Sequence, residues 1–318
     1  MQIGYKLATE AFTPTEIVRQ AVAAEQAGFD FVEMSDHFHP WLETQGHSGF
    51  TWSMLGAMAA KTEQVGLVTG VTCPSFRYHP AIVAQAAATV ALLSDGRFTL
   101  GVGAGERLNE HIIGTHFPAV GERHKVFREA LEIIRLLWQG GYQSFDGRFL
   151  KLEDAQVFDL PETLPQIIVA GSGPASLAIA KDFGDGVFAT DPDASLVEGI
   201  RAEKAGAPCY AEVALAWAPD VDSAAQEAHS KNRWAVGGWK VMAELPNPVN
   251  FKAASTTVTL DDVKDNFACG PDVSVHVEAA RPYVDAGYDH LVLLNAGPDP
   301  DGFLRFFTDE LGPALRAL

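Results

Sequence analysis

The chain has 318 residues, 47% of them hydrophobic, and a formal net charge of −18. A chain of this length can form one large α/β barrel or two ordinary domains. The acidic balance argues against nucleic acid or an anionic membrane as a partner, because both require a basic surface. The three cysteines, Cys73, Cys209 and Cys269, include no CxxC pair and indicate neither a disulfide framework nor a thiolate metal site. No signal-peptide pattern opens the sequence, so we expect a soluble protein of the reducing cytoplasm.

Strand and helix patterns alternate along the chain. A strand-like segment at 2–7 leads to a helix start at Thr13, with Pro14 at the first helical position and Glu16 completing a capping box. Further strands are expected near residues 30, 66, 98, 166, 186, 211 and 290, each followed by a helix. Eight such units without a linker predict a (β/α)8 TIM barrel, a single domain spanning 1–318. A doubly wound open sheet is the alternative, weakened by the lack of a GxGxxG turn after the first strand.

Two segments interrupt the alternation. Residues 142–158 have the form of two short strands around Phe145-Asp146-Gly147, which predicts an inserted hairpin. Residues 237–259 are the least periodic part of the chain, with Pro246 and Pro248 close together. We expect an irregular insertion there, lying over one end of the fold.

The segment after the expected second strand is the main candidate for chemistry. It reads Ser35-Asp36-His37 and continues to Trp41. Active sites of barrels lie at the C-terminal ends of the strands, where this loop falls. An imidazole beside a carboxylate is a candidate general acid or base, although Asp36 and His37 form an ordinary capping pair in the simpler interpretation.

Three more loops follow strands at the same end. The turn 103–109 carries Glu106, which either shares proton transfer with His37 or is a common acidic residue in a first helical turn. Gly171-Ser172-Gly173-Pro174 is either a phosphate cradle at a helix N-terminus or an ordinary tight turn. In 70–78, Arg77 and Tyr78 are interpreted as loop-stabilising residues. His37 and His39 lack a third ligand, and no metal site is expected.

These motifs together resemble one family. Those that carry the resemblance are SDHFHPW at 35–41, CPSFRYHP at 73–80, GVGAGERLNE at 101–110 and GYDHLVLLNAGP at 287–298. They are similar to the luciferase-like, coenzyme F420-dependent oxidoreductases, in the branch that includes F420-dependent glucose-6-phosphate dehydrogenase. The similarity runs nearly end to end and is weakest over 191–265.

The resemblance implies a barrel that holds coenzyme F420 in its mouth and passes hydride between the deazaflavin and a hydroxyl-bearing carbon. By position, His37 and Glu106 match the acid/base pair, and Trp41 matches a residue that flanks the substrate. Gly70-Val71 matches a non-proline cis peptide behind the ring. The other matched cofactor positions are Asp36, Cys73, Ala104, Gly105, Asn109, Gly171, Gly173, Ala175 and Ser176. Relatives are commonly homodimers, which the apolar early helices would suit.

The chain departs from the sugar-phosphate enzymes at the implied phosphate site. Thr190, Lys240 and Lys264 match three substrate-binding positions, but Asp193 stands where a fourth, basic residue is found. A carboxylate repels a phosphate dianion, so the resemblance does not imply glucose 6-phosphate as the substrate. An unphosphorylated sugar, another alcohol or a different phosphosugar remain open. Cys73 and Ala104 replace threonines and remove two hydroxyl groups from the implied cofactor contacts.

Two other functions are weighed against an F420-dependent dehydrogenase. One is a flavin mononucleotide-dependent monooxygenase of the same superfamily, against which the pairing of SDHF with GxGE argues. The other is a non-catalytic flavin-binding barrel, which would have no need of His37, Trp41 and Glu106 together.

Overall fold

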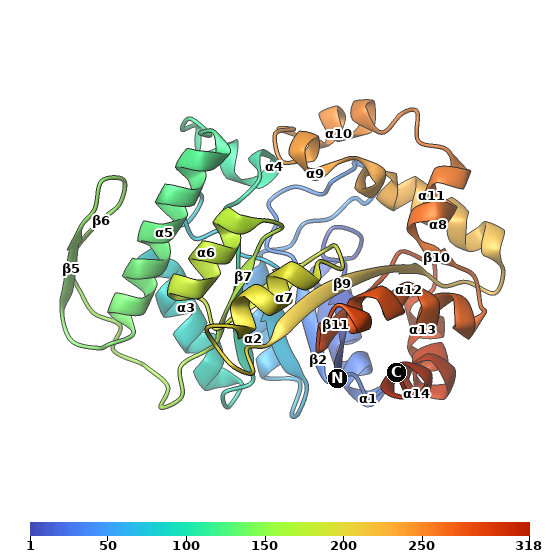
Figure 1. Ribbon diagram of the computed structural model, residues 1–318, viewed down its shortest axis with the longest axis horizontal. Coiled ribbons are helices and arrows are strands. Elements are labelled where there is room, and N and C mark those ends of the chain that lie inside the picture. The colour runs from blue at the N-terminus through green and yellow to red at the C-terminus, as the bar shows by residue number, and fades with distance from the viewer.

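Eight parallel strands close into a barrel in the computed structural model, which describes residues 1–318 (Figure 1). The order around the barrel is β1, β2, β3, β4, β7, β8, β9, β11 and back to β1, and the β8–β9 pairing completes the closure. The barrel strands are β1 Gln2–Leu7, β2 Phe31–Met34, β3 Gly66–Thr69, β4 Phe98–Val102, β7 Ile167–Ala170, β8 Gly186–Ala189, β9 Cys209–Ala216 and β11 His290–Asn295. The predicted (β/α)8 barrel and the positions of its eight strands are confirmed.

Helices surround the barrel, several short ones lying over one of its ends (Figure 1). They are α1 Pro14–Gln26, α2 Thr51–Ala59, α3 Pro80–Leu93, α4 Arg107–Glu110, α5 Val120–Leu137, α6 Pro174–Phe183, α7 Ala194–Arg201, α8 Val221–Asn232, α9 Trp239–Met242, α10 Pro248–Ala254, α11 Leu260–Asn266, α12 Val273–Asp285, α13 Pro300–Phe306 and α14 Gly312–Arg316. Helix α1 begins at Pro14 as predicted, and the Thr13 hydroxyl accepts a hydrogen bond from the Glu16 amide at 3.3 Å. The capping box is not completed, because the Glu16 carboxylate accepts hydrogen bonds from Arg19 and Gln20 instead. None of the helices is long and apolar enough to cross a membrane.

The barrel interior contains an apolar plug contributed by six strands. It comprises Phe31, Val68, Ile168, Phe188, Tyr210 and Val292. Side chains two residues further along a strand point to the same side. Glu33, two residues after Phe31, and Glu212, two residues after Tyr210, therefore also point into the barrel. Val68 and Val292 are their direct partners on the neighbouring strands, so the two carboxylates lie beside the plug.

The two segments that interrupt the alternation, 142–158 and 237–259, take different forms. A short antiparallel hairpin, β5 Gln143–Asp146 with β6 Lys151–Ala155, lies outside α5 at the edge of the molecule (Figure 1). The expectation of irregular structure over 237–259 is met only in part, since the short helices α9, of 4 residues, and α10, of 7 residues, lie within that range. These short helices lie with α8 and α11 over one end of the fold, and β10 Ala268–Cys269 adds to the edge of β9 (Figure 1). Pro248 does not break the segment because it begins α10, where its missing N–H is no loss.

The plug gives a stability prediction. Phe31 is 3% exposed, and its ring lies 5.4 Å from the ring of Tyr210. Phe31→Ala should lower the free energy of unfolding by about 3–5 kcal/mol, because it leaves a cavity that the closed barrel cannot collapse to fill. Chemical denaturation measures the change. The matched control is Phe38→Ala, where the ring is 52% exposed, with an expected change within about 0.5 kcal/mol. Equal losses in the two variants would contradict the assignment of Phe31 to the plug.

Candidate active site

His37 lies at the mouth of the barrel between two carboxylates. Its Nδ1 is 2.7 Å from Oε1 of Glu10, and its Nε2 is 3.7 Å from Oε1 of Glu106. The three residues come from the loops after β2, β1 and β4, and the His37 side chain is only 9% exposed. The Glu10 contact is short but is not aligned as a hydrogen bond, so it is best described as a buried ion pair.

The electrostatics of the pair favour the charged form of both partners. Burial opposes protonation of His37, but the Glu10 carboxylate and, more weakly, Glu106 outweigh it and raise the imidazole pKa above its usual value. Burial also opposes ionisation of Glu10, yet His37 lowers the pKa of that carboxyl to about 2. The stabilisation from this pair is therefore fully present between the ordinary values of 4.5 and 6.5. It is lost as the pH falls toward 2, and again as the pH rises through the folded-state pKa of His37.

The carboxylate next to His37 in sequence does not pair with it. Asp36 is fully buried, and its oxygens accept hydrogen bonds from Thr72 at 2.9 Å, Tyr78 at 3.0 Å and Arg77 at 3.1 Å. Asp36 and His37 therefore do not act side by side as an acid/base pair, because the Asp36 carboxylate is held by these three partners. Arg77 also donates to the Asp36 carbonyl, which confirms its interpretation, with Tyr78, as a loop-stabilising residue.

Trp41 forms one wall of the site. Its ring meets the edge of His37 with the ring centroids 4.8 Å apart, and it stacks on Trp234 at 4.0 Å. Phe251 of α10 packs against it at 5.1 Å. Trp234 lies just after α8 in a short 3₁₀ turn, Arg233–Val236, so half of this aromatic wall comes from the segment between β9 and α12. Trp41 is 8% exposed and Phe251 1% exposed, so most of this wall is buried.

Asn109 links two of the loops at the mouth. Its side-chain oxygen accepts hydrogen bonds from the amides of Phe38 at 2.7 Å and His39 at 2.9 Å, and its amide group donates to Glu106. The resemblance implied a cofactor contact at Asn109. The structure shows a fully buried side chain that holds the His37 loop and the Glu106 turn in register.

The other implied cofactor positions line two sides of the mouth. Gly70–Val71 is a cis peptide, as the resemblance implied. Cys73 is buried against the Gly105 turn, where a Cβ on the glycine would lie 2.7 Å from the Cys73 sulfur, and burial raises the pKa of that thiol. Ala104 is partly buried in the same turn. Gly171, Gly173, Ala175 and Ser176 lie together at the start of α6, where Ser176 Oγ donates to the Gly173 carbonyl at 2.9 Å.

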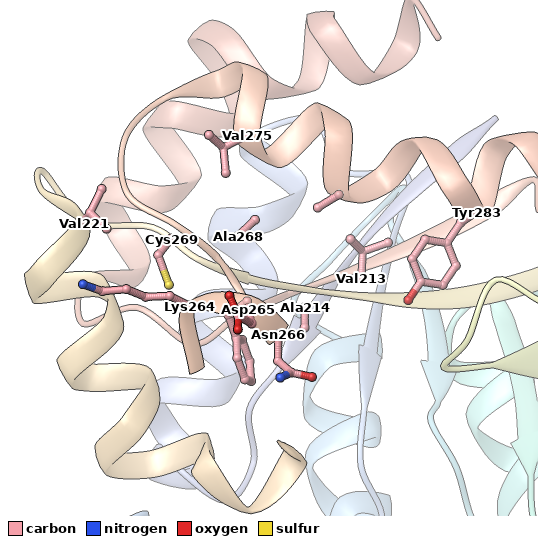
Figure 2. Close-up of a pocket in the computed structure, with 12 residues that line it drawn as sticks. Val213, Ala214, Val221, Lys264, Asp265, Asn266, Ala268, Cys269, Val275 and Tyr283 are labelled. Carbon is pink, nitrogen blue, oxygen red and sulfur yellow. The ribbon is translucent and has the colours of Figure 1, made fainter. Parts of the chain in front are cut away.

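The implied phosphate-binding residues are not joined to one another or to His37 by any hydrogen bond or ion pair. The Thr190 carbonyl accepts a hydrogen bond from the Tyr283 hydroxyl at 2.8 Å, and Lys240 is exposed on α9. Lys264 pairs with Asp222 at 2.9 Å. In Figure 2 Lys264 extends toward Val221 while Tyr283 lies at the opposite side of a cavity of about 410 Å³. That cavity lies beside β9 and β10 and includes none of His37, Trp41 and Glu106.

Asp193 has a structural contact of its own. It is the N-cap of α7, and its carboxylate accepts hydrogen bonds from the Ser195 amide at 2.9 Å and the Ser195 hydroxyl at 2.6 Å. A lysine at this position would lose that cap, so the departure from the basic residue that the resemblance implied affects both the charge and the local structure.

Sequence reasoning missed Glu10 and Trp234. Glu10 lies three residues beyond β1, at the same barrel end as His37, so a search of every strand's C-terminal loop would have found it. Trp234 gave no comparable signal, because it lies between β9 and α12, outside the regular strand and helix alternation from which the barrel was predicted. Its contact with Trp41 depends on how the segment folds back over the mouth.

Comparison with known proteins identifies the family of this chain. The family model for luciferase-like monooxygenases matches residues 1–290. An F420-dependent glucose-6-phosphate dehydrogenase of Microbacterium testaceum is 34% identical over 99% of this chain and 98% of its own. An F420-dependent hydroxymycolic acid dehydrogenase of Mycobacterium tuberculosis is 38% identical over 99% of this chain and 88% of its own. A solved F420-dependent secondary alcohol dehydrogenase, in complex with an F420–acetone adduct, has a TM-score of 0.90 at 29% identity, covering 99% of both chains.

The chain therefore belongs to the luciferase-like family. Within it, the chain belongs to the branch of F420-dependent oxidoreductases that includes the F420-dependent glucose-6-phosphate dehydrogenases.

The Glu10–His37 contact gives a prediction about protonation. Glu10→Gln should lower the pKa of His37, because it removes the carboxylate that stabilises the imidazolium. Histidine NMR titration measures the change, and His37→Ala identifies the resonance. Glu43→Gln removes one negative charge from an exposed position in the same loop and should leave the titration of His37 in place. An unchanged or raised pKa in Glu10→Gln would contradict the ion pair.

Proposed function

We propose that the protein is a coenzyme F420-dependent oxidoreductase that transfers hydride between a hydroxyl-bearing carbon and the deazaflavin. The observation that carries this proposal is the imidazole of His37 held between Glu10 and Glu106 beside the aromatic wall of Trp41. F420-dependent relatives at 34% and 38% identity support F420 over flavin mononucleotide as the cofactor. The site is built for proton exchange, which is what oxidation of an alcohol requires besides hydride transfer.

The residues of the mouth fit a flat ring with an anionic tail. Glu33 and Ser176 pack so closely on Gly70 and Gly171 that neither position could carry a Cβ, which fixes these two turns at the mouth. Gly173, the N-cap of α6, has no side chain to occupy the first N–H groups of the helix, and these suit a phosphate. Ser75 Oγ, two residues from Cys73, is buried without a partner and can donate to a bound group. Bound here, F420 would supply the hydride acceptor or donor.

His37 and Glu106 carry the proton chemistry in this proposal. Nδ1 of His37 faces Glu10, which leaves Nε2 as the atom that exchanges a proton with the substrate hydroxyl. When the alcohol is oxidised, its O–H proton passes to Nε2, its C–H hydrogen leaves as hydride, and the carbon becomes a carbonyl. Glu10 stabilises the resulting imidazolium. Glu106 is the second proton-exchanging group, oriented by its hydrogen bond from Asn109.

We further propose that the substrate is an alcohol without a phosphate group. Asp193 adds negative charge where the sugar-phosphate enzymes have a basic residue, and Lys264 is already paired with Asp222. The stacked rings of Trp41 and Trp234 supply an apolar surface for a carbon skeleton next to His37. The relatives named for hydroxymycolic acid and for a secondary alcohol are consistent with this substrate class.

We also propose a homodimer in the cytoplasm. Helix α3 has no charged residue, and its exposed side carries Ile82, Leu92 and Leu93, which are 57%, 43% and 55% exposed, beside Gln85 and Thr89. A second copy packed on α3 would remove the three aliphatic side chains from water.

The proton roles predict a separation of binding from turnover. His37→Ala and Glu106→Gln should each lower kcat by about 10²–10⁴-fold while F420 still binds, because neither change removes the backbone cradle. F420 titration measures binding and absorbance at saturating substrate measures turnover. The control is His116→Ala, an exposed histidine with no polar contact. Near wild-type turnover in either variant would remove that residue from the mechanism.

The charge at Asp193 predicts substrate choice. The wild type should reduce F420 faster with unphosphorylated alcohols than with glucose 6-phosphate. Asp193→Asn should raise kcat/KM for the phosphosugar on the order of tenfold, because asparagine keeps the N-cap of α7 but removes the repulsive charge. Asp191→Asn, an exposed neighbour, is the control. A wild type that prefers glucose 6-phosphate would refute the proposal.

A further inference from the structure

A cavity of about 170 Å³ opens within the inserted segment, next to the short helices α9 and α10. All the residues that line it belong to the stretch 234–258, so the barrel strands contribute none of its walls. Two of them, Trp234 and Phe251, also form the aromatic wall of the active site, with ring centroids 4.0 and 5.1 Å from that of Trp41. A third, Met242, is buried in the same hydrophobic cluster as Trp41. The cavity and the active site therefore share a wall.

The side chains of the lining offer little to a polar group. None of them is charged, and the one hydroxyl, on Ser255, donates to the Phe251 carbonyl at 2.8 Å. The indole nitrogen of Trp234 is the one side-chain nitrogen or oxygen of the lining without a hydrogen-bond partner. A bound water typically makes about three hydrogen bonds, which these side chains cannot supply. The cavity therefore suits an apolar group, and roughly 150 Å³ of apolar space is enough to bind a molecule as large as benzene.

The cavity lies close enough to His37 for one molecule to occupy both places. The ring centroid of Trp41 is 4.8 Å from that of His37 and 4.0 Å from that of Trp234, so one aromatic ring separates the imidazole from the lining. On its outer side the lining is open to water, because Val241 is 61% exposed and a Cβ on Gly238 would meet no atom within 4 Å. Apolar surface left open beside an active site is typical of a ligand-binding groove. An alcohol with its hydroxyl at His37 can extend its carbon chain along this wall into the cavity.

We propose that this cavity is a subsite for the carbon chain of the substrate, so that the protein acts on aliphatic alcohols whose chain reaches from His37 along the aromatic wall into the cavity. The chain takes no part in the reaction, which stays at the hydroxyl-bearing carbon. Its burial supplies binding free energy at a distance from that carbon, which favours long alcohols over short ones. The preference for long alcohols in turnover rests on the proposed function, whereas binding of a chain in the cavity does not.

The first test measures F420 reduction with a series of secondary alcohols from propan-2-ol to octan-2-ol. In the wild type, kcat/KM should rise about three- to fourfold for each methylene group that enters the cavity. Ala254→Leu places a larger side chain in the lining and should lower the preference for octan-2-ol over propan-2-ol about tenfold. Ala253→Leu, at an exposed neighbour on α10 outside the lining, should keep the preference within about twofold. An active wild type without this preference, or a preference that Ala254→Leu leaves intact, would overturn the inference.

The second test measures binding in the full chain without turnover. The indole N–H of Trp234 is observed by NMR and assigned with Trp234→Phe. Octan-2-ol should shift this resonance at concentrations at which propan-2-ol does not, and its apparent Kd should rise about tenfold in Ala254→Leu but not in Ala253→Leu. A resonance that octan-2-ol leaves in place would overturn the inference. A wild type that binds octan-2-ol in this way but reduces F420 with no alcohol would instead refute the proposed function and support the cavity as a binding site.

Discussion

Barrel closure brings two carboxylates against one nearly buried imidazole, and the rest of the site is arranged around that contact. Glu10, His37 and Glu106 come from loops after three different strands, so no local segment forms the contact on its own. A charged imidazole with little access to water requires such partners, and the fold supplies them through strand register. The Asn109 side chain then fixes the His37 loop against the Glu106 turn.

Much of the fold was predictable because the strands and several helix starts are specified by local sequence patterns. The eight strands were visible as short apolar runs separated by helical periods, because parallel barrel strands are buried on both faces. Helix starts such as Thr13-Pro14 were readable because capping is a local interaction. The inserted segment 237–259 was not, since its short helices are stabilised by tertiary contacts such as that of Phe251 with Trp41 rather than by a long amphipathic period.

The candidate site was predictable in its loops and less so in its contacts. His37, Trp41 and Glu106 were found because they follow strands at the mouth. Adjacency misplaced the carboxylate partner: Asp36 is held by Arg77, Thr72 and Tyr78, and Glu10 takes the position beside the imidazole. Pairings between loops depend on the order of strands around the barrel, which a sequence motif does not carry. Likewise, the N-cap contact of Asp193 emerged only from the structure.

The aromatic wall is contributed by two parts of the chain with different constraints. Trp41 lies in the loop that carries His37, whereas Trp234 and Phe251 belong to the segment inserted between β9 and α12. Changes in that segment can reshape the surface presented to a substrate without moving a strand of the barrel. Selection for a new substrate can therefore act on one half of the wall while the loop that carries His37 and Trp41 is preserved, so the fold allows these two parts of the site to evolve separately.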